Sequence, residues 1–201
     1  EIKLTNIFDE KLYYLGDIKI KTKYVPEICA EYFRYIKALK IPQKKCLVLD
    51  LDNTLWGGII GEDGINGIRL GPDPMGKSFL EFQKYILALH KRGVILAINS
   101  RNNLEDALDV FRNHPHMILK EENFAAVRIN WRDKSQNLKE LADEINIGLD
   151  SMVFFDDDKF NRELVKKTLP MVEVEDLPKD FSLYSSSIIN SNYFDSLSLT
   201  D

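Results

Sequence analysis

The chain has 201 residues, of which 44% are hydrophobic and 29% are charged, and its formal net charge at pH 7 is −5. These values are typical of a soluble globular domain with a sizeable core, and the acidic balance disfavours nucleic acid as the main partner. The sequence shows neither a long apolar stretch nor a secretory signal, so we expect a cytoplasmic protein without a membrane partner. The two cysteines, Cys29 and Cys46, have no metal-ligand spacing and predict no disulfide framework.

Residues 1–43 are expected to form an N-terminal arm that ends in a helix. Residues 1–26 carry scattered aromatic side chains without a clear period, which indicates an irregular arm. A helix is predicted from Pro26 onward, and Pro42 is expected to end it. Its apolar face comprises Ile28, Tyr32, Tyr35 or Ile36, and Leu39.

Residues 44–180 are expected to form one domain in which strands alternate with helices. The run that ends at Leu49 is continuously apolar, which is typical of a strand buried on both faces of a parallel sheet. Alternating strands and helices imply βαβ units with right-handed crossovers, so the predicted class is an α/β, Rossmann-like, doubly wound parallel sheet. The further strands are expected at 94–98, 124–129, 152–155 and near 171–174, and long helices at 76–92 and from 134 onward.

Two segments are assigned to the surface of this domain. Residues 57–74 are rich in glycine and predict a small flap over the end of the first strand, with a plain surface hairpin as an equal alternative. The flap is too short to be a large cap domain, so a bulky substrate is expected to have access. Residues 181–201 are expected to be a tail or linker, because residues 182–192 are rich in serine and asparagine. A further domain is expected to follow it.

Two carboxylates, Asp50 and Asp52, follow the first strand one residue apart. Like charges at the end of a buried strand are costly unless they are compensated, and a divalent cation is the simplest compensation. A calcium loop is disfavoured, because Thr54 and Leu55 stand where such a loop needs an oxygen ligand of the Asp or Asn type and a glycine. A solvated acidic turn is the other alternative, and we favour a catalytic site.

Further polar groups stand at the ends of later strands. Ser100 ends the second strand, Lys134 opens a later helix, and residues 156–158 are three aspartates after another buried strand. Each alone has a plain explanation: a helix cap, a solvated lysine and an acidic turn. In a parallel sheet, however, these ends share one edge, so the groups are expected to converge there. Together they supply what phosphoryl transfer needs: a carboxylate nucleophile, a proton shuttle, a cation site and donors to phosphate oxygens.

Four stretches resemble the FkbH-like group of phosphatases in the haloacid dehalogenase (HAD) superfamily, subclass IIIC. These are residues 45–64, with Asp50 to Thr54, and residues 96–103, 129–134 and 146–157. The resemblance spans about residue 13 to the end of the chain. It implies a HAD-like fold, dependence on Mg²⁺ and a phosphorylated small-molecule substrate. For some members of the group it also implies transfer of a glyceryl unit from 1,3-bisphosphoglycerate to an acyl carrier protein.

The resemblance also implies a role for each matching residue. Asp50 is the expected nucleophile, which forms an aspartyl-phosphate, and Asp52 the expected acid and base. Ser100 and Lys134 are expected to hold the phosphoryl group. The remaining expected phosphate-binding residues are Asn53, Thr54 and Arg101. The expected Mg²⁺ ligands are Asp50, Asp52 through its backbone carbonyl, Asp156 and Asp157, and the resemblance does not say which of the last two binds directly.

The chain departs from the group's pattern in three places, one of which is the pair Asp158-Lys159. Arg101 replaces a lysine found in many relatives, which keeps the charge but alters the donor geometry. Asn99 replaces a cysteine that some acyl-handling relatives carry, and an amide cannot hold an acyl group as a thiolate can. Asp158-Lys159 replaces Asn-Pro after the paired aspartates. We therefore expect a phosphatase first, a glyceryl transferase/phosphatase second and a non-catalytic docking module third, with the natural substrate undetermined.

Overall fold

The computed structural model of the chain describes residues 7–40, 43–191 and 193–195. The chain divides into two compact units, one of residues 1–42 with 195–201 and one of residues 43–194. In the described part of the first unit, helix α1 (Glu10–Gly16) and helix α2 (Val25–Lys40) are joined through a 3₁₀ turn, Thr22–Tyr24. The arm is therefore partly helical rather than irregular, because the Asp9 side chain caps α1 by accepting a hydrogen bond from the amide of Leu12. The expected stop at Pro42 lies outside the described residues.

The second unit contains a five-stranded parallel sheet of order β3-β2-β1-β4-β5. Strand β1 is central, and its Leu49 pairs with Ile98 on one side and with Phe155 on the other. All four residues of β1 are buried, as expected for a strand that is covered on both faces. The predicted α/β class is thus confirmed. The strands are β1 (Cys46–Leu49), β2 (Ile95–Ser100), β3 (Phe124–Ile129), β4 (Met152–Phe155) and β5 (Glu173–Val174).

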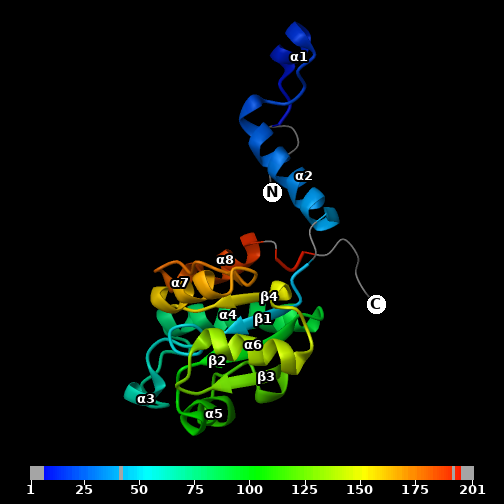
Figure 1. Cartoon of the computed structure of the whole chain (residues 1–201). Coiled ribbons are helices and arrows are strands. Elements are labelled where there is room, and N and C mark those ends of the chain that lie inside the picture. The colour runs from blue at the N-terminus through cyan, green and yellow to red at the C-terminus, as the bar shows by residue number, and fades with distance from the viewer. Residues whose placement is uncertain (1–6, 41–42, 192, 196–201) are drawn as a thin grey trace. The chain divides into compact units, whose positions relative to one another are not determined.

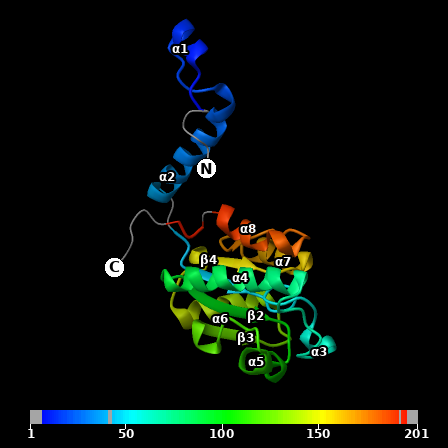
Figure 2. The same cartoon turned by 180° about the vertical axis from the view of Figure 1, so that it is seen from behind.

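Helices cover both faces of this sheet (Figures 1 and 2). On one face, Cys46 and Val48 pack with residues of α6 (Lys134–Ile145) and α7 (Lys159–Thr168). On the other, Leu47 and Leu49 pack with residues of α4, α5 and α8. Because side chains alternate along a strand, one short apolar strand serves both layers of the core. The helices of the second layer are α4 (Pro74–Lys91), α5 (Leu104–Asn113) and α8 (Tyr184–Ser191).

The compact unit continues past residue 180, the expected end of the domain. A 3₁₀ turn (Phe181–Leu183) leads into α8, whose Tyr184 and Ile188 are 2% and 3% exposed. The Tyr184 ring makes edge contacts with the rings of Phe79 and Phe82 on α4, at centroid distances of 6.1 and 5.5 Å. A few apolar residues thus anchor a segment whose average composition is polar.

The glycine-rich segment 57–74 forms a loop with one short helix, α3 (Ile60–Asp63), rather than an extended hairpin. Gly57 and Arg69 form an isolated antiparallel bridge at its base, and Ile60 and Ile68 are buried in the core. Within the described residues this segment is a small flap, and no large cap domain accompanies it. No helix in the described ranges is both long enough and apolar enough to cross a membrane.

Candidate active site

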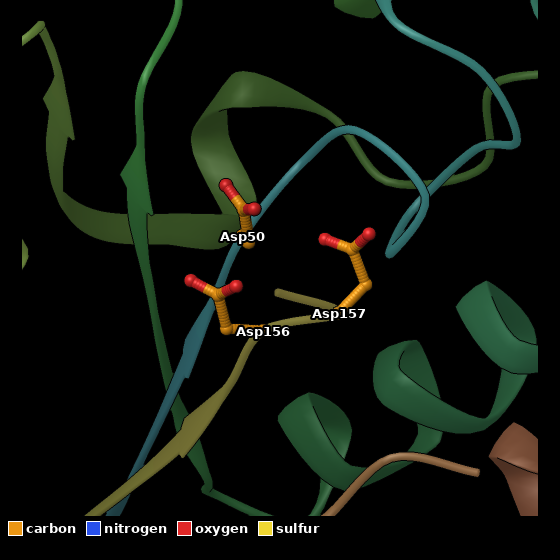
Figure 3. Close-up of side chains that lie close together, drawn as sticks. All are labelled: Asp50, Asp156 and Asp157. Carbon is orange, nitrogen blue, oxygen red and sulfur yellow. The ribbon is translucent and has the colours of Figure 1, made fainter. Parts of the chain in front are cut away.

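Three carboxylates meet at the carboxyl edge of the sheet. Asp50 directly follows β1, and its amide donates to the carbonyl of Phe155, which extends the pairing of β1 with β4 by one residue. Asp156 and Asp157 directly follow β4. One carboxylate oxygen of each residue lies within 4.8 Å of the others, and Figure 3 shows the three side chains gathered around one space. The parallel register of neighbouring strands therefore brings together groups that are far apart in the sequence.

Lys134, the first residue of α6, joins this cluster from the side. Its Nζ lies 3.0 Å from Oδ2 of Asp50 and 2.5 Å from Oδ2 of Asp156, and the residue is 1% exposed. Burial by itself lowers the pKa of Lys134, but the two carboxylates outweigh that effect and raise it. The lysine is therefore a fixed cation, and it compensates part of the negative charge of the cluster.

The remaining negative charge fits a divalent cation. Burial, with repulsion from Asp50, raises the pKa of Asp156, and burial with repulsion from both neighbours raises the pKa of Asp157 to about 7. Oδ1 of Asp50 is buried and has no hydrogen-bond partner among the residues that the structure describes. Asp156 accepts from Lys134 and from the amide of Asp158, whereas no hydrogen bond to the Asp157 carboxylate is found among the described residues. Carboxylate oxygens with open positions are the ligands that Mg²⁺ prefers.

The side chain of Asp52 lies outside this group of three. Its Oδ1 accepts from the indole of Trp56 at 2.9 Å and from the amide of Ile60 at 3.1 Å, and its Oδ2 accepts from Asn102 at 3.0 Å. Burial raises the pKa of Asp52, although these donors oppose the shift. The carboxylate of Asp52 is thus oriented by donors rather than by the other carboxylates. The cluster of described carboxylates does not include the side chain of Asp52, and a part for its backbone carbonyl stays a prediction.

The other expected site residues surround this arrangement. Ser100 is 1% exposed, and its Oγ accepts from the side chain of Asn102 at 3.2 Å. Thr54 is fully buried, and Arg101 is half-buried. Neither Oγ1 of Thr54 nor Nε of Arg101 has a hydrogen-bond partner within the described ranges. The side chain of Asn53 instead accepts from the amide of Gly58 at 2.9 Å, so it shapes the loop rather than pointing free to a phosphate.

Two residues of the site were not identified from the sequence. Asn102 links Asp52 to Ser100, and Arg162 of α7 donates to the backbone carbonyls of both Asp156 and Asp157. Asn102 lies in the stretch 96–103, shortly after the end of a predicted strand, so the sequence could have identified it as a site residue. Arg162 gave no signal, because an arginine in the first turns of a polar helix is usually solvated.

The chain has the expected HAD-like fold, and a phosphatase domain of known structure shares it. The N-terminal part of protein BF1531 from Bacteroides fragilis, a crystal structure that contains a phosphatase domain in complex with Mg, is 38% identical with a TM-score of 0.84. The match covers 96% of this chain and 51% of that chain, so the present chain spans about half the length of this relative.

Two further structures are more distant from this chain. An uncharacterized protein from Corynebacterium glutamicum is 15% identical with a TM-score of 0.50, over 76% of this chain and 98% of that one. A HAD-family enzyme from Bacteroides thetaiotaomicron, solved with magnesium and inorganic phosphate, is 17% identical with a TM-score of 0.46, over 69% and 97%. Comparisons with models of protein families and with curated proteins give no match. The expected class of enzyme, a phosphatase, agrees with the phosphatase domain in the structure of BF1531.

Proposed function

We propose that this domain is a Mg²⁺-dependent phosphohydrolase that works through an aspartyl-phosphate on Asp50. The observation that carries the proposal is the different surroundings of the two oxygens of the Asp50 carboxylate. Lys134 holds its Oδ2 at 3.0 Å, and its buried Oδ1 accepts no hydrogen bond from the described part of the chain; two further carboxylates lie beside Asp50. One oxygen of this carboxylate would bind the metal ion and the other would attack phosphorus, so Asp50 can serve as both ligand and nucleophile. The Mg that accompanies the phosphatase domain of BF1531 supports the cofactor.

Asp50, Asp156 and Asp157 would hold the Mg²⁺ ion, together with the backbone carbonyl of Asp52. When bound, the ion supplies positive charge that stabilises the charge developing on the phosphoryl oxygens. Lys134 and Ser100 supply further stabilisation, because the ammonium group and the hydroxyl group lie at the same edge of the sheet.

The proton transfers fall to Asp52. An oxygen of Asp50 attacks phosphorus, the bond from phosphorus to the leaving oxygen breaks, and Asp52 donates a proton to that oxygen. Asp52 then takes a proton from water, which attacks the aspartyl-phosphate, releases phosphate and restores Asp50. The raised pKa of Asp52 favours the protonated form that the first step needs, and Trp56 and Asn102 hold its carboxyl group in place.

We assign the chain to the FkbH-like group on its motifs, but we favour hydrolysis over transfer of a glyceryl unit to an acyl carrier protein. The cysteine of the second unit, Cys46, is buried in β1, and burial raises its pKa to about 12. Asn99 holds its amide against the carbonyl of Lys134 and the side chain of Asn137. Neither residue offers a thiolate to the site. A non-catalytic docking role is disfavoured, because the acidic cluster, Lys134 and Ser100 are all in place.

Hydrolysis of p-nitrophenyl phosphate, with and without Mg²⁺, tests the proposal in the wild type and in Asp50→Asn. The substitution keeps the size of the side chain but removes the nucleophile, so Mg²⁺-dependent turnover is expected to vanish. Asp143→Asn, which changes an exposed carboxylate on α6, is the matched control. Unchanged turnover in Asp50→Asn contradicts the assigned nucleophile. If the wild type binds Mg²⁺ without turnover, 1,3-bisphosphoglycerate with an acyl carrier protein is the next substrate to test.

A further inference from the structure

Arg162 makes an unusual contact with the acidic loop. It lies in α7, one turn after the loop, and the residue is 8% exposed. Its Nη1 donates to the carbonyl of Asp156 at 2.7 Å and to the carbonyl of Asp157 at 2.7 Å. Carbonyls of neighbouring residues point in opposite directions in an extended strand, so two that converge on one nitrogen mark a sharp change of direction.

We infer that Arg162 is a positioning residue that holds residues 156–158 in the conformation that binds the metal. This inference rests on the proposed function. With both carbonyls turned toward Arg162, the carboxylates of Asp156 and Asp157 are left to face Asp50 (Figure 3). Hydrogen bonds to groups that carry the ligands commonly tune the affinity of a metal site. Hydrogen bonds from a charged donor are stronger than those from a neutral donor. They can therefore hold a loop in which carboxylates of like charge lie close together.

If Arg162 acted only through its charge, its removal would change the affinity for Mg²⁺ in the direction opposite to that expected for a positioning residue. A positive charge close to the site repels a bound cation, so its removal by itself tightens Mg²⁺ binding. The positioning role predicts weaker binding in spite of that gain, because the carboxylates lose their arrangement. The direction of the change in affinity therefore separates the two roles.

The surroundings of Arg162 provide a matched control. Its Nε lies 3.5 Å from Oδ1 of Asp176, and Lys166, on the same helix, lies 2.7 Å from the same oxygen. The hydrogen bonds of Lys166 go to Glu163 and Asp176, and none to the acidic loop is found in the described part of the chain. Lys166→Met therefore removes an ion pair and a positive charge from α7 while it leaves both carbonyl contacts in place.

Titration calorimetry of the whole chain with MgCl₂ is the test, with wild type, Arg162→Met, Arg162→Lys and Lys166→Met. The Kd for Mg²⁺ is expected to rise about tenfold or more in Arg162→Met, the usual cost of losing such a partner, and to stay at the wild-type value in Lys166→Met. Arg162→Lys is expected to recover part of the affinity, since an ammonium group also donates to carbonyls. At saturating MgCl₂, turnover of Arg162→Met is expected to return toward that of the wild type.

Equal or tighter Mg²⁺ binding in a folded Arg162→Met overturns the inference and leaves the proposed phosphatase intact. If Arg162→Met does not fold, a second neutral variant takes its place. Arg162→Gln then serves as the neutral variant, and unchanged affinity there also overturns the inference. A wild type that binds no Mg²⁺ removes the proposed cofactor and this inference together.

Discussion

The hydroxyl group of Tyr184 donates a hydrogen bond of 3.1 Å to the backbone carbonyl of Asn53, a residue 131 positions earlier in the chain. Asn53 follows Asp52 and has a φ of 52°, in the left-handed region that residues other than glycine rarely adopt. Helix α8 therefore stabilises the loop that carries Asp50 and Asp52. The C-terminal segment, expected to be a linker, contributes to the geometry of the site.

Removal of this hydroxyl group in Tyr184→Phe is expected to lower turnover several-fold and to cost about 1 kcal/mol of stability, because one buried hydrogen bond is lost while the ring remains. Tyr184→Ala is expected to cost about 3–5 kcal/mol, because it also leaves a cavity against Phe79 and Phe82. Urea unfolding and steady-state turnover of both variants are the measurements. Wild-type turnover in Tyr184→Phe contradicts a role for this bond in the site.

Replacement of the buried lysine in Lys134→Met is expected to lower both stability and activity. The substitution leaves Asp50 and Asp156 without their cation, and loss of one partner of a buried ion pair costs about 3–5 kcal/mol. A loss of about 10²–10³ in kcat is expected for a donor to the phosphoryl oxygens. Urea unfolding and assays on p-nitrophenyl phosphate measure the two effects. Lys139→Met, an exposed position on the same helix, is the control that should match the wild type.

Asn102→Ala is expected to lower kcat without weakening Mg²⁺ binding. Asn102 donates to Asp52 and to Ser100, so its loss frees the proposed acid and base to move. The side chain of Asp52 is not part of the group of three carboxylates, so the Kd for Mg²⁺ should stay the same. The neighbouring Asn103→Ala, at an exposed position, should behave as the wild type. A parallel loss of Mg²⁺ affinity would show that Asn102 acts on the metal site instead.

The raised pKa values of Asp156 and Asp157 predict how pH affects the metal-free protein. Both carboxyl groups hold protons more tightly in the folded chain than in the unfolded chain. Their contribution to stability is therefore fully present at low pH and is lost as pH rises from about 4 toward 7. Thermal unfolding in EDTA at several pH values should show the wild type losing stability relative to Asp157→Asn over this interval. Added MgCl₂ should reverse the loss.

The two cysteines are expected to differ in reactivity. Cys29 is exposed on α2, whereas Cys46 is buried in β1 and its pKa is raised to about 12 by burial. The thiolate is the reactive form, so one equivalent of a disulfide reagent such as DTNB should react with the native protein and two with the unfolded protein. Fast reaction of two thiols in the native state would contradict the burial of Cys46.

The sequence by itself determined the sheet and the residues at its carboxyl edge. Continuous apolar runs, each followed by a polar residue, mark the strands before Asp50, Ser100 and Asp156. Because parallel strands end at a common edge, their order along the chain sufficed to predict that these groups gather there. Lys134 could be added for the same reason, as the first residue of the helix that follows β3.

Tertiary structure alone decided which way the remaining polar side chains turn and which late segment belongs to the core. Asp52 faces Trp56 and Asn102 rather than the other carboxylates, and Arg162 turns inward to two carbonyls. Helix α8 is buried through Tyr184 and Ile188 although its composition is polar. These outcomes depend on partners from distant parts of the chain. Local patterns record the average polarity of a segment, and they do not record whether a charged or aromatic side chain finds a buried partner.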